Sequence, residues 1–404
     1  MRRLEVMVSS FVFDLAFDYF EAFWSLVQRY TCSMILNNWY VAAASDELDE
    51  TPLQTTMLGC DFVLFRDADR QIHCLSDTCC HRGASLSRGK CVNGCVQCPY
   101  HGWEFAGDGR VQRIPSLGEI KIPRKARVDS YPVQERYGLI WVFLGDAPPS
   151  QRYELPEMLP EYGDEQSWRI TRMQRDWKVN WARLKENLAD ASHLYLVHSF
   201  GKHLPEQTQV FAVEETEWGI RVPQVYHVVP DKSSLTAANA PQAEQPRNKS
   251  EVTIEISVIG MIQKNTQFMA SGYDQIIWNA LTPIDNHHTR HYTLHFRNFQ
   301  REPQHDASME KTIVWGLEED AAVMDYLKPP LNPVSNSNEL LVATDGPEKA
   351  YRDKMRRLAA ELGEIDWRAL RDRSEDNVLV IPSPARADGG DWVHQTVPLV
   401  TATG

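Results

Sequence analysis

The sequence predicts an α+β protein in which a small all-β domain precedes a larger domain of antiparallel strands and helices. Short β-rich runs bounded by Asp, Gly and Pro fill residues 38–146. A Pro-Pro-Ser sequence at 148–150 predicts a domain boundary, and longer strand and helix patterns follow it. The expected organisation is an N-terminal extension at residues 1–33, the all-β domain at 34–150, the mixed domain at 151–385 and a C-terminal tail at 386–404.

Within the first domain, three runs rich in β-branched and aromatic residues predict strands at 62–65, 72–75 and 138–144. A Gly-Asp-Gly sequence at 107–109 comes after a Trp-Glu-Phe run at 103–105, and this predicts a hairpin turn.

In the second domain, interleaved apolar and polar residues predict helices at 177–198, 314–327 and 347–362, and strands at 252–262, 274–281 and 289–296. A stretch rich in Ser, Ala, Gln, Asn and Pro between residues 230 and 250 predicts a loop.

The composition argues against two classes of partner. The net charge is −13, whereas a nucleic-acid binder normally presents a basic face. The apolar run at 10–27 is interrupted by Asp14, Asp18 and Glu21, so it is too short to cross a bilayer. An amphipathic helix, or a translated leader ahead of a true start at Met34, accounts for it instead. We therefore expect a cytoplasmic protein with no membrane span and no nucleic-acid partner.

The cysteines indicate a metal site. Six of the eight cysteines fall within 25 positions, whereas a disulfide scaffold would spread them over a small chain. Those six are Cys74, Cys79, Cys80, Cys91, Cys95 and Cys98.

Four residues have the spacing of a [2Fe–2S] cluster with mixed ligands. The pattern is Cys79-x-His81 and then Cys98-x-x-His101, and in Rieske clusters two imidazoles replace two thiolates on one of the irons. Zinc is the alternative, because Cys and His at short spacing also bind zinc, and Cys95 with Cys98 has the spacing of a zinc knuckle. The mixing of Cys with His in each pair favours the cluster.

A second pair of histidines lies in the predicted helix at 177–198. His193 and His198 are five residues apart, which on a regular helix is a rotation of roughly 140°. Both side chains reach one metal only if the helix is distorted there, so we predict a local distortion between them. Two His and one carboxylate form the facial arrangement that non-haem Fe(II) uses, although lone helical histidines are usually ordinary surface or core residues.

These motifs resemble those of the Rieske non-haem iron oxygenases. The resemblance rests on Cys-x-His-Arg-Gly-Ala at 79–84, Cys-Pro-Tyr-His-Gly-Trp-x-Phe at 98–105 and Asn-x-x-Asp-x-x-His-x-x-x-x-His at 187–198. The opening Asn-Trp-Tyr-Val-Ala-Ala at 38–43 is similar to vanillate O-demethylase oxygenase components. Ser192 stands where the two-subunit ring dioxygenases have Tyr, which favours the group that also contains carbazole dioxygenase and pheophorbide a oxygenase.

The resemblance implies roles for further residues. Asn187 and Asp190 would belong to the catalytic machinery, with Asp190 linking an iron-bound histidine to a Rieske histidine across a subunit boundary. The third iron ligand would be a carboxylate that opens a downstream helix. Asp320 matches best, with Glu319 and Asp325 as alternatives.

The resemblance also implies an activity. A terminal oxygenase of this kind takes electrons from a NAD(P)H-dependent reductase or a ferredoxin, and with O2 it hydroxylates or oxidatively demethylates an aromatic or other hydrophobic small molecule. The implied cofactors are a [2Fe–2S] Rieske cluster and a mononuclear Fe(II), and the implied assembly is a head-to-tail homotrimer. The implied second domain is a helix-grip (START-like) fold whose strands, with residues 259–268 and 276–279 as candidates, wrap a hydrophobic pocket. Two alternatives to an oxygenase are a Rieske electron carrier and a binding protein stabilised by a structural zinc, both without oxygenase activity.

Overall fold

The structure is a computed structural model, and it describes residues 34–199, 201, 209–226, 250–269, 272–332 and 338–400. The expectations for the segment at 1–33 and for the loop between 230 and 250 lie outside these residues, apart from Ser250. Over the described ranges, no helix combines the length and the apolar character needed to cross a bilayer.

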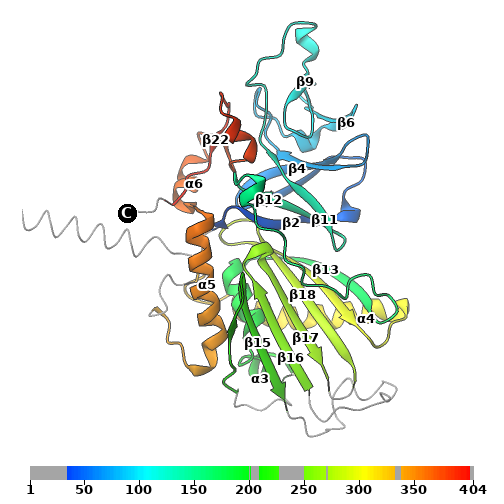
Figure 1. Ribbon diagram of the computed structural model, residues 1–404, viewed down its shortest axis with the longest axis vertical. Helices are drawn as coiled ribbons and strands as arrows, with labels where there is room; N and C mark the ends of the chain where they lie inside the picture. The colour runs from blue at the N-terminus through cyan, green and yellow to red at the C-terminus, as the bar shows by residue number, and fades with distance from the viewer. Residues whose placement is uncertain are drawn as a thin grey trace, which may run out of the picture.

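The N-terminal part is all β, and it forms the upper half of the molecule in Figure 1. Its three sheets have the orders β10-β5-β4-β3, β11-β12-β2 and β6-β7-β8-β9. The strands are β2 (Asn38–Ala44), β3 (Leu53–Met57), β4 (Cys60–Arg66), β5 (Ile72–Ser76), β6 (Lys90–Val92), β7 (Cys95–Gln97), β8 (Glu104–Phe105), β9 (Val111–Arg113), β10 (Ser130–Tyr131), β11 (Val133–Arg136) and β12 (Leu139–Leu144). The three predicted strands and the hairpin between β8 and β9 are therefore confirmed.

Two strands of this part form the junction with the second domain. All six residues of β12 and all seven of β2 are buried, as expected for strands that are covered on both faces. The Trp141 ring of β12 packs edge-to-face against Trp278 of the second domain, with ring centroids 6.0 Å apart. Asn38, at the start of β2, donates a hydrogen bond to the carbonyl of Val258 (2.9 Å).

The second domain is built on a seven-stranded antiparallel sheet in the order β13-β19-β18-β17-β16-β15-β14. Its strands are β13 (Arg169–Trp177), β14 (Glu214–Glu215), β15 (Gly219–Tyr226), β16 (Ser250–Ser257), β17 (Ile262–Phe268), β18 (Asp274–Pro283) and β19 (Thr289–Arg297). The single strand expected at 252–262 is instead the end of β16, a turn and the start of β17. Gly260 makes that turn with φ of 75°, and a Cβ there would lie 2.8 Å from Leu155.

The two faces of this sheet meet different partners. One face packs against α2 (Trp181–Ala189), α4 (Asp306–Met324) and α5 (Gly346–Leu362), which Figure 1 shows beside the strands. The other face is covered by the connection from the first domain, where Trp168 packs against Phe296, and by β2 and β12, where Trp141 of β12 packs against Trp278. The strands predicted at 274–281 and 289–296 and the helix at 347–362 are confirmed.

The helix expected at 177–198 is wrong in its extent. Trp177 is the last residue of β13, and the helix α2 begins only after Asn180, whose side chain caps the Ala182 amide at 3.0 Å. The helix expected at 314–327 begins earlier, at Asp306, where Arg169 (Nε–Oδ1, 3.1 Å) and the fully buried Arg297 hold its first carboxylate.

The C-terminal segment folds back onto the first domain. Arg386 holds Asp129 through two hydrogen bonds of 2.7 Å, and Tyr131 donates to the carbonyl of Ile381 at 2.7 Å. Residues 376–378 and 393–395 also line a cavity of about 230 Å³ together with Cys79, Cys80, His81 and Gly83. At the other end, β1 (Met34–Ile35) pairs with β20 (Glu364–Ile365). Arg386, His394 and Val397 of the C-terminal segment are thus held against the fold.

Candidate metal centres

The first candidate centre is formed by two loops with the same backbone pattern. In each loop the N–H of the first cysteine donates to the carbonyl five residues later, at 2.9 Å for Cys79 and 2.8 Å for Cys98. Gly83 and Gly102 adopt φ of 73° and 70°, and each donates back to the cysteine carbonyl of its own loop. Since only glycine adopts this backbone without strain, the Cys-x-x-x-Gly spacing in both motifs has a structural cause.

Four of the sequence-predicted residues come together at these loops. The thiols of Cys79 and Cys98 are buried, and the rings of His81 and His101 are exposed with centroids 4.4 Å apart. Trp103 stacks on His81 at 4.5 Å. Burial, with a further contribution from the nearby Cys98 thiol, raises the pKa of the Cys79 thiol to about 12. Two thiols on the inner side and two imidazoles on the outer side fit a cluster with one thiolate-bound and one imidazole-bound iron.

The second candidate centre depends on a break in the chain after α2. Asp190 leaves the helix with ψ of 132°, and the single-turn helix α3 (Leu194–Val197) follows. His193 lies directly before α3 and His198 directly after it, where the backbone is again extended. The distortion predicted between the two histidines is therefore wrong in its place, because residues 194–197 form a helical turn. The helix breaks at Asp190, before His193, and ends at His198.

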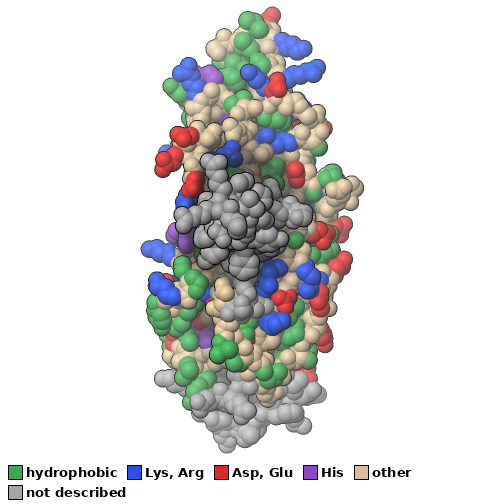
Figure 2. Space-filling model, turned by 90° about the vertical axis from the view of Figure 1, so that its left-hand side faces the viewer, with side chains coloured by type: hydrophobic (Ala, Val, Ile, Leu, Met, Phe, Trp, Pro, Cys, Tyr) green, Lys and Arg blue, Asp and Glu red, His purple; other side chains and the backbone are tan. Residues whose placement is uncertain are grey.

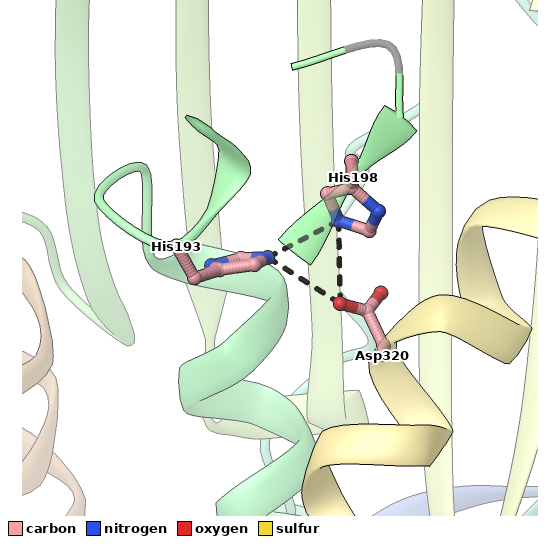
Figure 3. Close-up of side chains that lie close together, drawn as sticks. All are labelled: His193, His198 and Asp320. Carbon is pink, nitrogen blue, oxygen red and sulfur yellow. Dashed lines mark hydrogen bonds and ion pairs between the residues drawn. The ribbon is translucent and has the colours of Figure 1, made fainter. Parts of the chain in front are cut away.

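Figure 3 shows that His193, His198 and Asp320 point toward one another. The two Nε2 atoms are 3.3 Å apart, and they lie 3.4 and 3.2 Å from Oδ1 of Asp320. A metal about 2.1 Å from each ligand separates neighbouring ligand atoms by about 3.0 Å in an octahedron and about 3.4 Å in a tetrahedron. Three side-chain atoms at these separations fit one ion, with the remaining positions open to small molecules.

Each of these three residues has a hydrogen-bond partner of its own. Asp190 Oδ2 lies 3.0 Å from Nδ1 of His193. Glu319 Oε2 lies 3.1 Å from Nδ1 of His198, and Asn187 donates to Oδ1 of Asp320 at 3.2 Å. Partners of this kind fix the ring orientation and tautomer of metal-binding histidines.

The charged groups of this centre shift the pKa values of His193 and Asp320. Burial lowers the pKa of His193, but the hydrogen bonds that its ring donates to Asp190 and Asp320 outweigh burial and raise that pKa to about 9. Burial likewise raises the pKa of Asp320, and its bonds to the two histidines outweigh burial and hold that pKa well below its usual range. Without a metal, His193 therefore holds a proton at neutral pH that a cation would displace.

The two alternatives for the third iron ligand, Glu319 and Asp325, lie outside the triangle of His193, His198 and Asp320. Glu319 contacts the outer nitrogen of His198 and the Ser199 amide (3.2 Å), and Asp325 is the residue that follows α4. Asp320 itself lies near the C-terminal end of α4. The expectation that this carboxylate opens a helix is therefore wrong, because α4 begins 14 residues earlier than Asp320.

Sequence reasoning missed the polar character of the sheet face behind α2. The apolar residues of β18, such as Ile276 and Trp278, face the first domain and the connection to it. The alternate positions face the helices, and there the cross-strand neighbours Gln263, Asn279 and Thr293 are polar and buried. The period-2 alternation of strands predicts two different faces, but it does not say which face meets the helices.

Comparison with known families identifies both halves of the chain. Residues 38–132 match the Rieske [2Fe-2S] domain, and residues 177–361 match the vanillate O-demethylase oxygenase C-terminal domain. The chain belongs to the Rieske oxygenases. The Rieske domain implies a [2Fe–2S] cluster, and oxygenase components of this family carry a mononuclear iron. The two centres described above fit those two cofactors.

Individual relatives match over shorter stretches. Dicamba O-demethylase oxygenase component from Stenotrophomonas maltophilia is 38% identical over 168 residues, which cover 41% of this chain and 48% of that protein. The iron-sulfur subunit TsaM1 of the toluene-4-sulfonate monooxygenase system of Comamonas testosteroni is 35% identical over 167 residues, or 41% of this chain and 46% of that protein. The matched stretch thus spans about half the length of these relatives.

Solved structures match over most of the fold. Dicamba monooxygenase bound to dicamba has a TM-score of 0.66 and 25% identity, and the match covers 81% of this Rieske oxygenase and 98% of that chain. NdmA of Pseudomonas putida CBB5 with caffeine has a TM-score of 0.67 and 24% identity over 80% of this chain and 90% of that one, which shows a shared fold.

Proposed function

We propose that the protein is a terminal oxygenase that uses O2 and externally supplied electrons to hydroxylate, or oxidatively demethylate, an aromatic or other apolar small molecule. The Rieske cluster and the mononuclear Fe(II) supply the redox chemistry when bound. The side chains of the protein hold these cofactors, orient their ligands and position the substrate. Both demethylation and ring hydroxylation fit, because hydroxylation of a methyl group on oxygen or nitrogen releases that group.

The observation that carries this proposal is the triangle of His193, His198 and Asp320. Two imidazoles and one carboxylate on one side of an Fe(II) leave adjacent positions open, as O2-activating non-haem iron sites require. An electron carrier needs only the first centre, so this second centre favours an oxygenase over a carrier.

We further propose that the active unit is a head-to-tail homotrimer. The loops of Cys79 and Cys98 lie toward the upper end of the molecule in Figure 1, whereas α3 lies at the lower end of the sheet. A ring in which one subunit's exposed His81 and His101 approach the next subunit's Asp190 would bring the two centres together. Asp190 suits this position because its carboxylate already contacts the ring of His193.

The exposed charges around the first centre suit an acidic electron donor. Between residues 82 and 125 only two acidic side chains are exposed, Asp108 and Glu119, although the whole chain carries −13. Figure 2 shows basic side chains at this end of the molecule. We define the basic face as the exposed residues Arg82, Arg88, Lys90, Arg110, Arg113, Lys121, Arg124 and Lys125. We propose that a ferredoxin or a reductase with an acidic surface docks there.

A reducing compartment, which we propose to be the cytoplasm, suits both the electron donor and the thiols. Seven cysteines of the described residues are unpaired. Separation of cell fractions with detection of the native protein would test this assignment.

Iron analysis with EPR tests the proposed function. We expect three irons per chain and the signal of a reduced Rieske cluster in the wild type. In His193→Ala we expect two irons and an unchanged cluster signal, because His193 holds only the mononuclear iron. His287→Ala, at an exposed histidine outside both centres, is the matched control. Zinc in place of iron, or loss of the cluster signal in His193→Ala, would overturn the proposal.

A further inference from the structure

The sheet face behind α2 carries polar atoms that are buried and without partners. Among the described residues, Nδ2 of Asn279, Oε1 of Gln263 and Nδ1 of His291 have no hydrogen-bond partner. These three side chains are 2%, 0% and 1% exposed. An unpaired buried polar atom costs about 1–3 kcal/mol, so three neighbouring ones need an explanation.

The three residues are neighbours on one face of the sheet. Gln263 of β17 is the cross-strand partner of Asn279 in β18, and Asn279 is bonded to His291 of β19 (Oδ1–Nε2, 2.7 Å). Thr293, directly opposite Asn279, donates to the same Oδ1 atom at 3.1 Å. The row Gln263–Asn279–His291 is thereby held in place across three strands.

This row adjoins the proposed iron centre. The amide of Gln263 donates to the carbonyl of Leu188 (2.6 Å), and the preceding residue, Asn187, donates to Asp320. His291 is close enough to Asp320 for the two to interact electrostatically. On the same side, Leu184, Leu281 and Met324 belong to one apolar cluster that Leu188 joins. A polar row beside apolar side chains and a reactive metal is the usual composition of a small-molecule site.

The hydrogen bonds within the row determine what it offers to a ligand. Oδ1 of Asn279 can only accept, so Nε2 of His291 carries the hydrogen, and Nδ1 of that ring is left with a lone pair. Burial lowers the pKa of His291 to about 3, which agrees with a neutral ring. Asn279 therefore presents a free NH2 group with two N–H donors, while Gln263 and His291 present free acceptors.

The nearby cations have other partners. Arg297 bonds to Thr171 (2.6 Å) and to Asp306. Lys185 donates to the carbonyl of Met261 (2.9 Å), and the guanidinium of Arg175 lies over the Trp177 ring at 4.7 Å. A carboxylate placed against the row would meet two free lone pairs, and only the amide of Asn279 would donate to it. A neutral amide would match all three positions.

We propose that Gln263, Asn279 and His291 recognise a neutral substrate group that contains both a carbonyl oxygen and an N–H, such as an amide or lactam, attached to an apolar ring. The carbonyl accepts from Asn279, and the N–H donates to Gln263 or His291. This assignment rests on the proposed oxygenase function, and it makes these three residues determinants of substrate specificity.

Calorimetric titration of the metal-loaded protein with benzamide, benzoate and toluene tests the proposal, because the three probes differ in one substituent. We expect benzamide to bind about tenfold more tightly than either of the others. Asn279→Leu should weaken benzamide about tenfold and leave toluene unchanged. Gln263→Leu is a second variant of the row, in case the first does not fold. Gln174→Leu, at an exposed residue on the opposite face of β13, is the control.

Four results would each overturn the proposal. They are a preference for benzoate, equal binding of all three probes, no binding of benzamide, and no effect of either row variant. Equal binding would mean that the row is paired with water only. Iron analysis of the same samples separates the two proposals. Three irons without a benzamide preference would overturn only the recognition of a neutral amide. A benzamide preference without the mononuclear iron would overturn the oxygenase function and leave the recognition standing.

Discussion

Asp190 and His193 form a pair in which a carboxylate oxygen lies 3.0 Å from one ring nitrogen, while the other ring nitrogen faces Asp320 at 3.4 Å. The ring is thus held by a carboxylate at each nitrogen. Asp190 lies where α2 ends, and its other oxygen accepts from the Ser192 amide at 2.6 Å. The break in the helix therefore both aims His193 and places a carboxylate behind it.

Replacement of Asp190 by Asn should separate electron transfer from metal binding. We expect Asp190→Asn to keep its iron and to lose roughly 10–100-fold in turnover, because a neutral amide has one accepting oxygen, whereas the carboxylate accepts from the Ser192 amide and the His193 ring at once. Iron content and the rate of cluster oxidation in a single turnover measure the two effects. Ser192→Ala, which removes a bond to Asp190 but keeps the carboxylate, should change the rate much less. An equal loss in both variants would contradict this role.

Asp320 and Glu319 are adjacent in sequence but contact different nitrogens of His198: Asp320 faces Nε2 and Glu319 faces Nδ1. Asp320→Asn should lose most of the mononuclear iron, because its oxygen completes the triangle with the two histidines. Glu319→Gln should weaken iron binding only about tenfold, because it acts through the outer nitrogen of His198. Iron retained after dialysis against a chelator measures the difference. The reverse order would make Glu319 the third ligand.

The buried histidines of the sheet predict a decline of stability in acid. Burial lowers the pKa of His291 to about 3 and that of His295 to about 4, from an ordinary value of 6.5. Between pH 6.5 and about 4 the unfolded chain takes up protons that the folded protein refuses, so stability falls as the pH falls. Each group contributes about 1.4 kcal/mol per pH unit in that window.

A non-titrating replacement tests this dependence. His291→Gln should reduce the change in urea midpoint between pH 6 and pH 4.5, since one titrating group is removed. His287→Gln is the control, because solvent surrounds that side chain in the folded protein. An unchanged pH dependence in His291→Gln would show that His291 takes up a proton within the fold.

The basic face predicts electrostatic control of reduction. Reversal of two of its charges in Lys121→Glu/Lys125→Glu should slow reduction of the cluster by an acidic donor, and added salt should narrow the difference from wild type. Reduction by dithionite should be the same in both proteins. Lys178→Glu, an exposed lysine of the second domain, serves as the control. A salt-independent difference would point to altered folding instead of docking.

Much of the first centre could be predicted from local sequence. Its four residues come from two loops, and each loop is defined by short spacing and a glycine that adopts positive φ. Such features lie within a few residues of one another, so the sequence displays them directly. The strands around the loops were predictable for the same reason, since their apolar runs end at turn residues.

The second centre was harder to predict because it depends on long-range contacts. The break at Asp190 is stabilised by its own side chain, and the helix pattern of the surrounding residues conceals it. Asp320 stands 122 positions after His198, and only the packing of α4 beside α3 brings it to the histidines. The polar row was missed because the orientation of a strand is decided by what covers each face of the sheet.

The attachment of the C-terminal part of the chain to the first domain bears on how electrons move. β1 pairs with β20, and Arg386 anchors the C-terminal segment to Asp129, so the cluster-bearing part is fixed at two separate places to the chain that follows the sheet. A part fixed in this way cannot swing to carry an electron along its own chain, as tethered carrier domains do. Transfer between the centres would then proceed without a diffusive domain movement, and its rate would be insensitive to solvent viscosity.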